Sequence, residues 1–159
     1  KDGLPYSPSK YEEFKILPGV KDSIIKLKKM KYLCIVVTNQ PDVSRGKITK
    51  ETVIKMNTYL NKELQLDDIF VCFHHDLDKC NCRKPKPGLI FKAAKKWNIN
   101  LKKSYMIGDR WKDIDAGSLS GCKTIFLDNN YKEKVKSQPN FTCENLLKAV
   151  NLIEKNETN

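Results

Sequence analysis

The chain has 159 residues, of which 30 are Lys or Arg and 19 are Asp or Glu, giving a formal net charge of +11. This length predicts a single domain over residues 1–159, with a core that needs no disulfide support. The charge favours an anionic partner, either a phosphorylated small molecule or nucleic acid, although many lysines can equally form a solvated coat. Because no apolar run reaches the length of a membrane span and no segment resembles a secretory signal, we expect a soluble protein of the reducing cytoplasm.

Apolar residues switch along the chain between helical spacing and unbroken β-branched runs. Residues 1–17 read as irregular, whereas Val20, Ile24 and Leu27 have helical spacing. The apolar run at 32–37 predicts a strand covered on both faces, and Thr49 is placed to cap the next helix. The other predicted elements are strands at 69–73, 104–107 and 123–127 and helices at about 87–98, 113–120 and 146–153.

This alternation predicts an α/β fold, in which a parallel sheet carries helices on both faces. Ligands of such sheets bind beyond the carboxyl ends of the strands. Candidate site residues follow three predicted strands: Thr38, Asn39 and Gln40 in the first case, the stretch beginning at Cys72 in the second, and Asp109 in the third.

Four metal-ligand side chains lie close together in the stretch after the second strand. Cys72 is one residue from His74, Cys80 is one residue from Cys82, and five residues separate the pairs. Three thiolates and one imidazole form a closed tetrahedral zinc site, which is typical of a structural metal. The clustering favours this site over scattered thiols or disulfides, and spacing alone leaves His75 open as a replacement for His74.

Fixed cations follow the metal ligands directly. Arg83, Lys84 and Lys86 alternate with Pro85 and Pro87, which restrict the backbone, and Pro87 is placed to open a helix. A rigid guanidinium or ammonium group suits phosphate. The sequence therefore predicts a phosphate-binding tip held by the metal.

The sequence GDRWKD at 108–113 carries a further ligand type. A carboxylate at a strand end is suited to Mg²⁺, which takes one or two protein carboxylates and keeps waters and substrate phosphate. Asp109 is better placed for this role than Asp113, for which the alternative is a first-turn residue that stabilises a helix N-terminus.

Together these motifs resemble the haloacid dehalogenase (HAD) phosphatases, within them the zinc-containing subgroup of D,D-heptose 1,7-bisphosphate and histidinol phosphatases. The resemblance runs from about Phe14 to Leu127. It implies a Rossmann-like domain without a large cap, a catalytic Mg²⁺ and a structural Zn²⁺. By position it implies that Thr38 and Lys84 steady the transferred phosphoryl group, that Asn39, Gln40, Pro41, Arg83 and Arg110 contact substrate, that Asp109 binds Mg²⁺, and that Cys72, His74, Cys80 and Cys82 hold zinc.

The chain departs from the family pattern in three places. Pro41-Asp42 replaces a common Ser-Gly, and Arg110 occupies the position of a lysine in the heptose enzymes. The resemblance also implies a nucleophile and a general acid in an Asp-x-Asp motif after an opening central strand, and the chain shows neither strand nor pair. Lys1-Asp2-Gly3 either echoes the end of this motif, with Asp2 as the acid, or lies downstream of it. We therefore expect the natural protein to begin upstream and the 159-residue chain alone to form no aspartyl-phosphate.

The leading hypothesis is a Mg²⁺-dependent phosphomonoesterase acting on the 7-phosphate of a heptose 1,7-bisphosphate. The alternatives are histidinol phosphate as substrate, a nucleic-acid 3′-phosphatase whose loop also resembles TNQ followed by Arg45-Gly46, and a non-catalytic, zinc-stapled binding domain. The zinc loop and the lack of aromatic residues among the lysines disfavour nucleic acid. We expect a monomer with no membrane partner.

Overall fold

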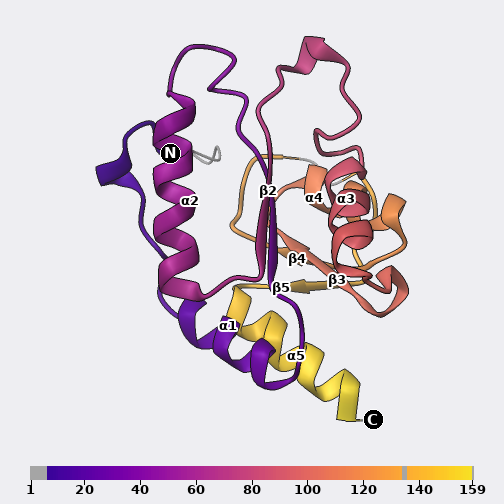
Figure 1. The fold of residues 1–159 in the computed structure, drawn as a ribbon. Coiled ribbons are helices and arrows are strands. Elements are labelled where there is room, and N and C mark those ends of the chain that lie inside the picture. Colours follow the sequence, from indigo (N-terminus) through magenta and orange to yellow (C-terminus); the bar gives the residue numbers. More distant parts are fainter. Residues whose placement is uncertain (1–6, 134–135, 159) are drawn as a thin grey trace. The chain divides into compact units, whose positions relative to one another are not determined.

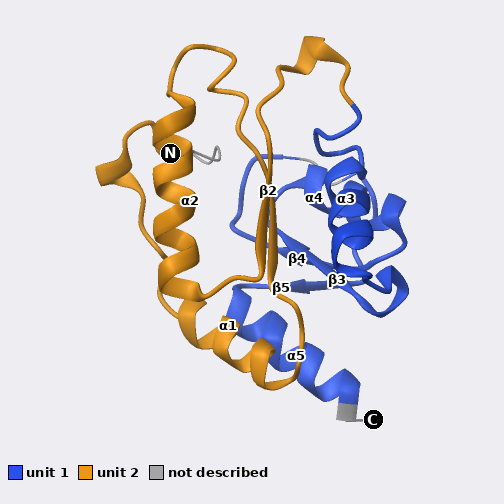
Figure 2. Cartoon of the chain, in the orientation of Figure 1, with its two compact units in different colours: residues 1–6, 81–159 blue, residues 7–80 orange. Residues whose placement is uncertain are grey.

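The computed structural model describes residues 7–133 and 136–158 (Figure 1). These residues fall into two compact units. In chain order, we call Ser7–Cys80 the first unit (orange, unit 2 in Figure 2) and the described residues from Asn81 onward the second unit (blue, unit 1 in Figure 2). The predicted single-domain organisation of residues 1–159 stays a prediction. Asp2 lies outside the described residues.

The first unit alternates helices with two parallel strands. Strand β1 (Ile35–Asn39) runs beside β2 (Asp68–Cys72), with Ile35 opposite Asp68 and Asn39 opposite Cys72 (Figure 1). The predicted cap of α2 is confirmed, because the Thr49 hydroxyl accepts a hydrogen bond from the Thr52 N–H at 3.1 Å. The helical elements are the 3-10 turn η1 (Tyr11–Glu13), α1 (Val20–Lys29), α2 (Lys50–Leu64) and the 3-10 turn η2 (Asp76–Asp78).

An apolar cluster at the start of α2 fixes this unit. Ile48, Val53 and Met56 are buried, and the N-terminal aromatic residues Tyr11 and Phe14 pack against them. The other partly buried residues on the cluster are Val43, Val71 and Phe73.

The strand predicted at 32–37 begins three residues later and ends two residues later. Lys31 has a left-handed backbone (φ 64°), and the Tyr32 N–H closes the end of α1 by donating to the Leu27 carbonyl. The Cys34 N–H then donates to the Asp67 carboxylate at 2.7 Å. As a result Thr38 and Asn39, which were expected in the loop, are the last two residues of β1.

The buried thiol of Cys34 makes the protein less stable as pH rises into the alkaline range. Burial, reinforced by the nearby Asp67 carboxylate and opposed by Lys28, raises the pKa of Cys34 to about 11. The unfolded thiol ionises near its ordinary pKa of about 8.5, so this contribution is complete below that pH and is lost as pH rises toward about 11. We expect the free energy of unfolding, measured with urea between pH 8 and 10.5, to fall less steeply with pH in Cys34→Ala than in wild type. The two slopes should differ by up to about 1.4 kcal/mol per pH unit. Parallel curves would contradict this.

The second unit is built on a three-stranded parallel sheet. Strands β3 (Tyr105–Gly108), β4 (Lys123–Leu127) and β5 (Phe141–Cys143) lie in that order, and β4 has the predicted bounds. The parallel ladders and the alternating helices of both units confirm the α/β fold class. The helical elements of the second unit are α3 (Gly88–Trp97), the 3-10 turn η3 (Leu101–Lys103), α4 (Trp111–Ser120) and α5 (Leu146–Thr158).

Packing in the second unit is tight around α4. This helix lies against β3 and β4, and Ile114, Ile125 and Val150 are fully buried. A methyl group at Gly117 would overlap the Met106 side chain, so the helix approaches β3 as closely as glycine permits. In the described residues no helix is both long and apolar enough to cross a membrane.

Strand β5 was not predicted. It follows Asn140, whose side-chain carbonyl accepts hydrogen bonds from the Thr124 N–H (2.7 Å) and hydroxyl (3.0 Å). The described strands form two ladders, β1-β2 and β3-β4-β5. A further central strand between 35–39 and 105–108 stays a prediction.

Candidate active site and metal centre

The end of β1 presents a hydroxyl that is already oriented. The Gln40 N–H donates to the Cys72 carbonyl at 2.7 Å and so continues the β1-β2 pairing past the strand. The Gln40 side-chain amide donates to the Thr38 hydroxyl oxygen at 3.4 Å. Pro41 then begins the loop to α2, and its carbonyl accepts from the Arg45 N–H at 3.1 Å. Thr38, Asn39 and Gln40 thus lie where the sequence placed candidate residues, at a strand's carboxyl end.

The four sequence-predicted metal ligands come together. One ligand atom each from Cys72, His74, Cys80 and Cys82 lies within 4.8 Å of the other three. The Cys72 sulfur is 3.5 Å from His74 Nδ1 and 3.8 Å from the Cys80 sulfur. Tetrahedral Zn–S bonds of about 2.3 Å place two sulfurs roughly 3.8 Å apart, so this donor set fits a four-coordinate metal. No disulfide joins any of the six cysteines.

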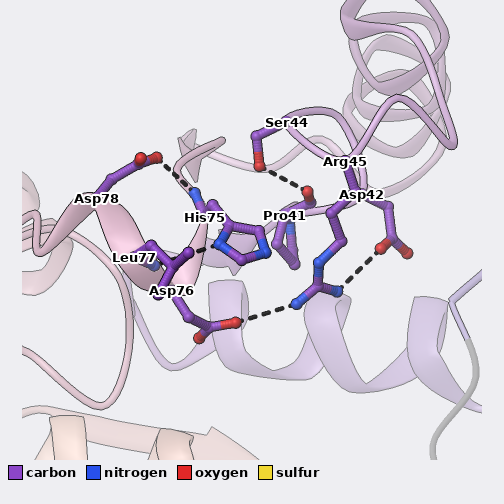
Figure 3. A network of polar contacts seen from close by, with 8 residues as sticks. All are labelled: Pro41, Asp42, Ser44, Arg45, His75, Asp76, Leu77 and Asp78. Carbon is purple, nitrogen blue, oxygen red and sulfur yellow. Dashed lines mark hydrogen bonds and ion pairs between the residues drawn. The ribbon is translucent and has the colours of Figure 1, made fainter.

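His75, the alternative ligand, has another role. Its Nδ1 accepts the Leu77 N–H at 3.2 Å, while its own N–H donates to the Asp78 carboxylate at 2.7 Å (Figure 3). These bonds cap the short η2 turn inside residues 72–82, which we call the metal loop. The structure therefore places His74 in the ligand cluster and His75 in the loop scaffold.

Lys84 is held in the second unit by a carboxylate that the sequence did not assign to it. The Lys84 ammonium is 2.7 Å from the Asp113 carboxylate, and the two side chains are 12% and 9% exposed. Asp113 is the third residue of α4 and also accepts the Arg110 N–H at 3.1 Å. The first-turn alternative for Asp113 is therefore confirmed, with an ion pair added to it.

Two glycines leave room for close neighbours in this part of the site. A methyl group at Gly108 would overlap the Asp113 side chain, and one at Gly88 would overlap the Asn81 carbonyl oxygen. The prediction that Pro87 opens α3 is wrong by one position, because Pro87 is the cap and the helix begins at Gly88. Arg83 lies in the same turn, where its carbonyl accepts the Lys86 N–H at 3.0 Å.

Asp109 and Arg110 are contacted by residues that sequence analysis missed. The Asn129 amide donates to the Asp109 carboxylate at 3.3 Å. Tyr131 has its pKa raised by burial and then by the negative charge and hydrogen bonding of Asp109. Arg110 binds Glu133 through two nitrogens, with Nε donating to Oε2 at 2.6 Å, and this hydrogen bonding raises the Arg110 pKa. The polar segment after β4 carried no motif that could have revealed these contacts.

A family model described as haloacid dehalogenase-like hydrolase matches residues 9–121. The chain belongs to this family. The resemblance recognised in the sequence is thereby confirmed, and the chain is a hydrolase of the HAD type. Its parallel strands and alternating helices are those expected of a HAD domain.

Relatives extend the similarity beyond the family match. The chain is 32% identical to the D-glycero-β-D-manno-heptose-1,7-bisphosphate 7-phosphatase of Pasteurella multocida, with 90% of this chain and 85% of that protein covered. It is 33% identical to the protein of the same name from Helicobacter pylori strain J99, with 92% and 87% covered. Each of these alignments spans most of both chains.

A solved structure supports the fold. The D,D-heptose 1,7-bisphosphate phosphatase of B. bronchiseptica, crystallised with magnesium and phosphate, superimposes with a TM-score of 0.85 at 24% identity. The match covers 98% of this chain and 96% of that chain. The HAD architecture therefore extends over almost the whole sequence.

Proposed function

We propose that this HAD hydrolase is a Mg²⁺-dependent phosphomonoesterase that removes the 7-phosphate of D-glycero-D-manno-heptose 1,7-bisphosphate. The names of the relatives, which align over about nine tenths of the chain, support this substrate. The structural observation that carries it is the Lys84–Asp113 ion pair of 2.7 Å at the start of α4, four residues after Asp109. A buried carboxylate fixes the ammonium as a ready point charge for a phosphoryl group.

We assign the other roles by position. The Thr38 hydroxyl donates a hydrogen bond to a phosphoryl oxygen, and Lys84 neutralises the charge that spreads over these oxygens as the transition state loosens. Bound Mg²⁺ supplies further charge neutralisation, and the ligand we assign to it is Asp109. The residues assigned to substrate contact are Asn39, Gln40, Pro41, Arg83 and Arg110. Arg110 must exchange Glu133 for substrate to take this role.

The reaction that we propose has two displacements. A carboxylate of the family's Asp-x-Asp motif attacks phosphorus, the bond to the sugar oxygen breaks, and the general acid protonates that oxygen. Water then attacks the aspartyl-phosphate and releases inorganic phosphate, restoring the carboxylate. Cys72, His74, Cys80 and Cys82 would hold Zn²⁺ with four protein ligands, a donor set typical of a structural metal, which would stabilise the loop and take no part in the displacement.

Phosphate release by the enzyme expressed from its natural gene tests the proposal. We expect kcat/KM for heptose 1,7-bisphosphate to exceed that for histidinol phosphate and for a 3′-phosphorylated oligonucleotide by about 10²-fold or more. Histidinol phosphate as the better substrate would move the assignment to that branch. Salt-sensitive oligonucleotide binding with 3′-phosphate release would support the nucleic-acid alternative. No release from any phosphomonoester would leave the binding-domain alternative.

We also propose that the protein is a cytoplasmic monomer. Sedimentation of the purified enzyme can check its oligomeric state.

A further inference from the structure

One arginine joins the loop after β1 to the metal loop. Arg45 Nη1 donates to the Asp42 carboxylate at 3.1 Å, and Nη2 donates to the Asp76 carboxylate at 3.0 Å (Figure 3). Asp42 lies three residues from Arg45, whereas Asp76 lies 31 residues away. Figure 3 shows the guanidinium between the two carboxylates. The planar fork of arginine allows it to bind both at once, which a lysine cannot do with the same geometry.

The first loop is otherwise held mainly by bonds within itself. The Ser44 hydroxyl donates to the Pro41 carbonyl at 2.8 Å, and the Lys47 N–H donates to the Asp42 carbonyl at 2.9 Å. The loop starts at the strand end that carries Thr38 and leads to the cap of α2. Its orientation therefore depends on the strand end, on Val43 packing in the apolar cluster and on the Arg45 contact with Asp76.

The other end of the contact is inside the metal loop. Asp76 is the first residue of η2 and lies between the ligands His74 and Cys80. The turn is closed by His75, which caps it through its ring and its N–H. Asp76 is 48% exposed and belongs to a short turn with a metal ligand on either side, so metal binding would constrain the segment that carries it.

We propose that Arg45 is a positioning residue that couples metal occupancy of the Cys–His cluster to the order of residues 41–47. Metal binding fixes η2, Asp76 then fixes the guanidinium, and Arg45 fixes the loop that follows Thr38. The proposal rests on the metal site of the proposed function but not on its substrate. Linkage makes the coupling reciprocal, so breaking the contact must weaken metal binding as much as metal loss loosens the loop.

Hydrogen exchange of the zinc-loaded and chelator-treated chain tests the coupling. In wild type we expect zinc removal to accelerate exchange of the amides of 43–47, while the Gln65 amide, which donates to the Asn61 carbonyl at the far end of α2, stays protected as an internal reference. In Arg45→Gln these loop amides should exchange fast with zinc bound, and zinc removal should change them little. Competition with a chelator should show zinc affinity reduced about two- to fivefold, the range for a partly exposed ion pair.

Three variants separate the contact from charge and from general loosening. Asp76→Asn should reproduce Arg45→Gln, and the double variant should add nothing further. Arg45→Lys keeps the positive charge but lacks the planar guanidinium, so it should restore only part of the zinc-dependent protection of the loop amides. Lys62→Gln removes the same charge from an exposed site on α2 and should retain the zinc-dependent protection.

The outcomes distinguish the proposal from the function on which it rests. Stoichiometric zinc with loop exchange that is the same in Arg45→Gln and wild type, or insensitive to zinc in wild type, would overturn the coupling alone. A wild-type chain that binds no zinc would overturn both the coupling and the metal site. The substrate assignment would be untouched by either result.

Discussion

Replacing Lys84 with Met is expected to lower turnover of the complete enzyme by about 10²–10³-fold, because it removes one fixed positive charge from the phosphoryl site. The variant should also lose stability. Its partner Asp113 is 9% exposed, and a buried carboxylate without a counter-charge costs about 3–5 kcal/mol. Phosphate release and urea unfolding measure the two effects separately.

A second substitution distinguishes the chemical role from the structural one. Asp113→Asn in the Lys84→Met background removes the unpaired charge and retains an oxygen that can accept the Arg110 N–H. We expect it to recover much of the lost stability without recovering turnover. Lys92→Met, at an exposed position of α3, serves as the control for charge and should behave as wild type. Wild-type turnover in Lys84→Met would refute the phosphoryl role.

Replacing Cys80 with Ser should reduce bound zinc from about one per chain to nearly none. A neutral hydroxyl is a poor substitute for a thiolate ligand, and binding free energy of a structural zinc contributes directly to folding. We therefore also expect a lower unfolding temperature and faster proteolysis in the loop between His74 and Lys86. Elemental analysis of the purified protein gives the metal content.

Cys143→Ser is the matched control for this change. Cys143 is a partly exposed thiol in β5 and is not among the clustered ligands. It should keep the full zinc content and a near-wild-type unfolding temperature. If Cys80→Ser retained its zinc, the four-ligand assignment would have to be abandoned.

Local patterns predicted the elements whose identity depends on neighbouring residues. The segment KTIFL at 123–127, whose last three residues are apolar, predicted the bounds of β4, and the spacing of Cys72, His74, Cys80 and Cys82 predicted a cluster that the structure brings together. Ligand spacing is informative because a short loop leaves few ways to arrange its side chains. It could not choose between His74 and His75, since that choice depends on which ring caps η2.

Polarity misled the prediction at the end of β1. Thr38 and Asn39 were expected in a loop because their side chains are polar. A strand continues as long as its backbone groups find partners, and the register with β2 extends to Asn39 opposite Cys72. Strand β1 also begins later than predicted for the same reason, since the Cys34 N–H donates to the Asp67 carboxylate and not to the neighbouring strand.

Contacts between distant segments could not be predicted from one sequence. Lys84 and Asp113 are 29 residues apart, and Arg110 binds Glu133 at a separation of 23. Nothing in the local sequence of either partner indicates the other, because the pairing depends on how helices and strands pack. Such contacts determine which charges are fixed before substrate arrives.

The lack of space beside Gly88 has a consequence for the evolution of this chain. A side chain there would overlap the backbone of Asn81, next to the ligand Cys82, so the first residue of α3 and the end of the metal loop share one volume. Mutational libraries selected only for stability should therefore return glycine at position 88 even when the cysteines are allowed to vary. Descendants of this chain that had lost the metal ligands would therefore still be expected to carry glycine at this position.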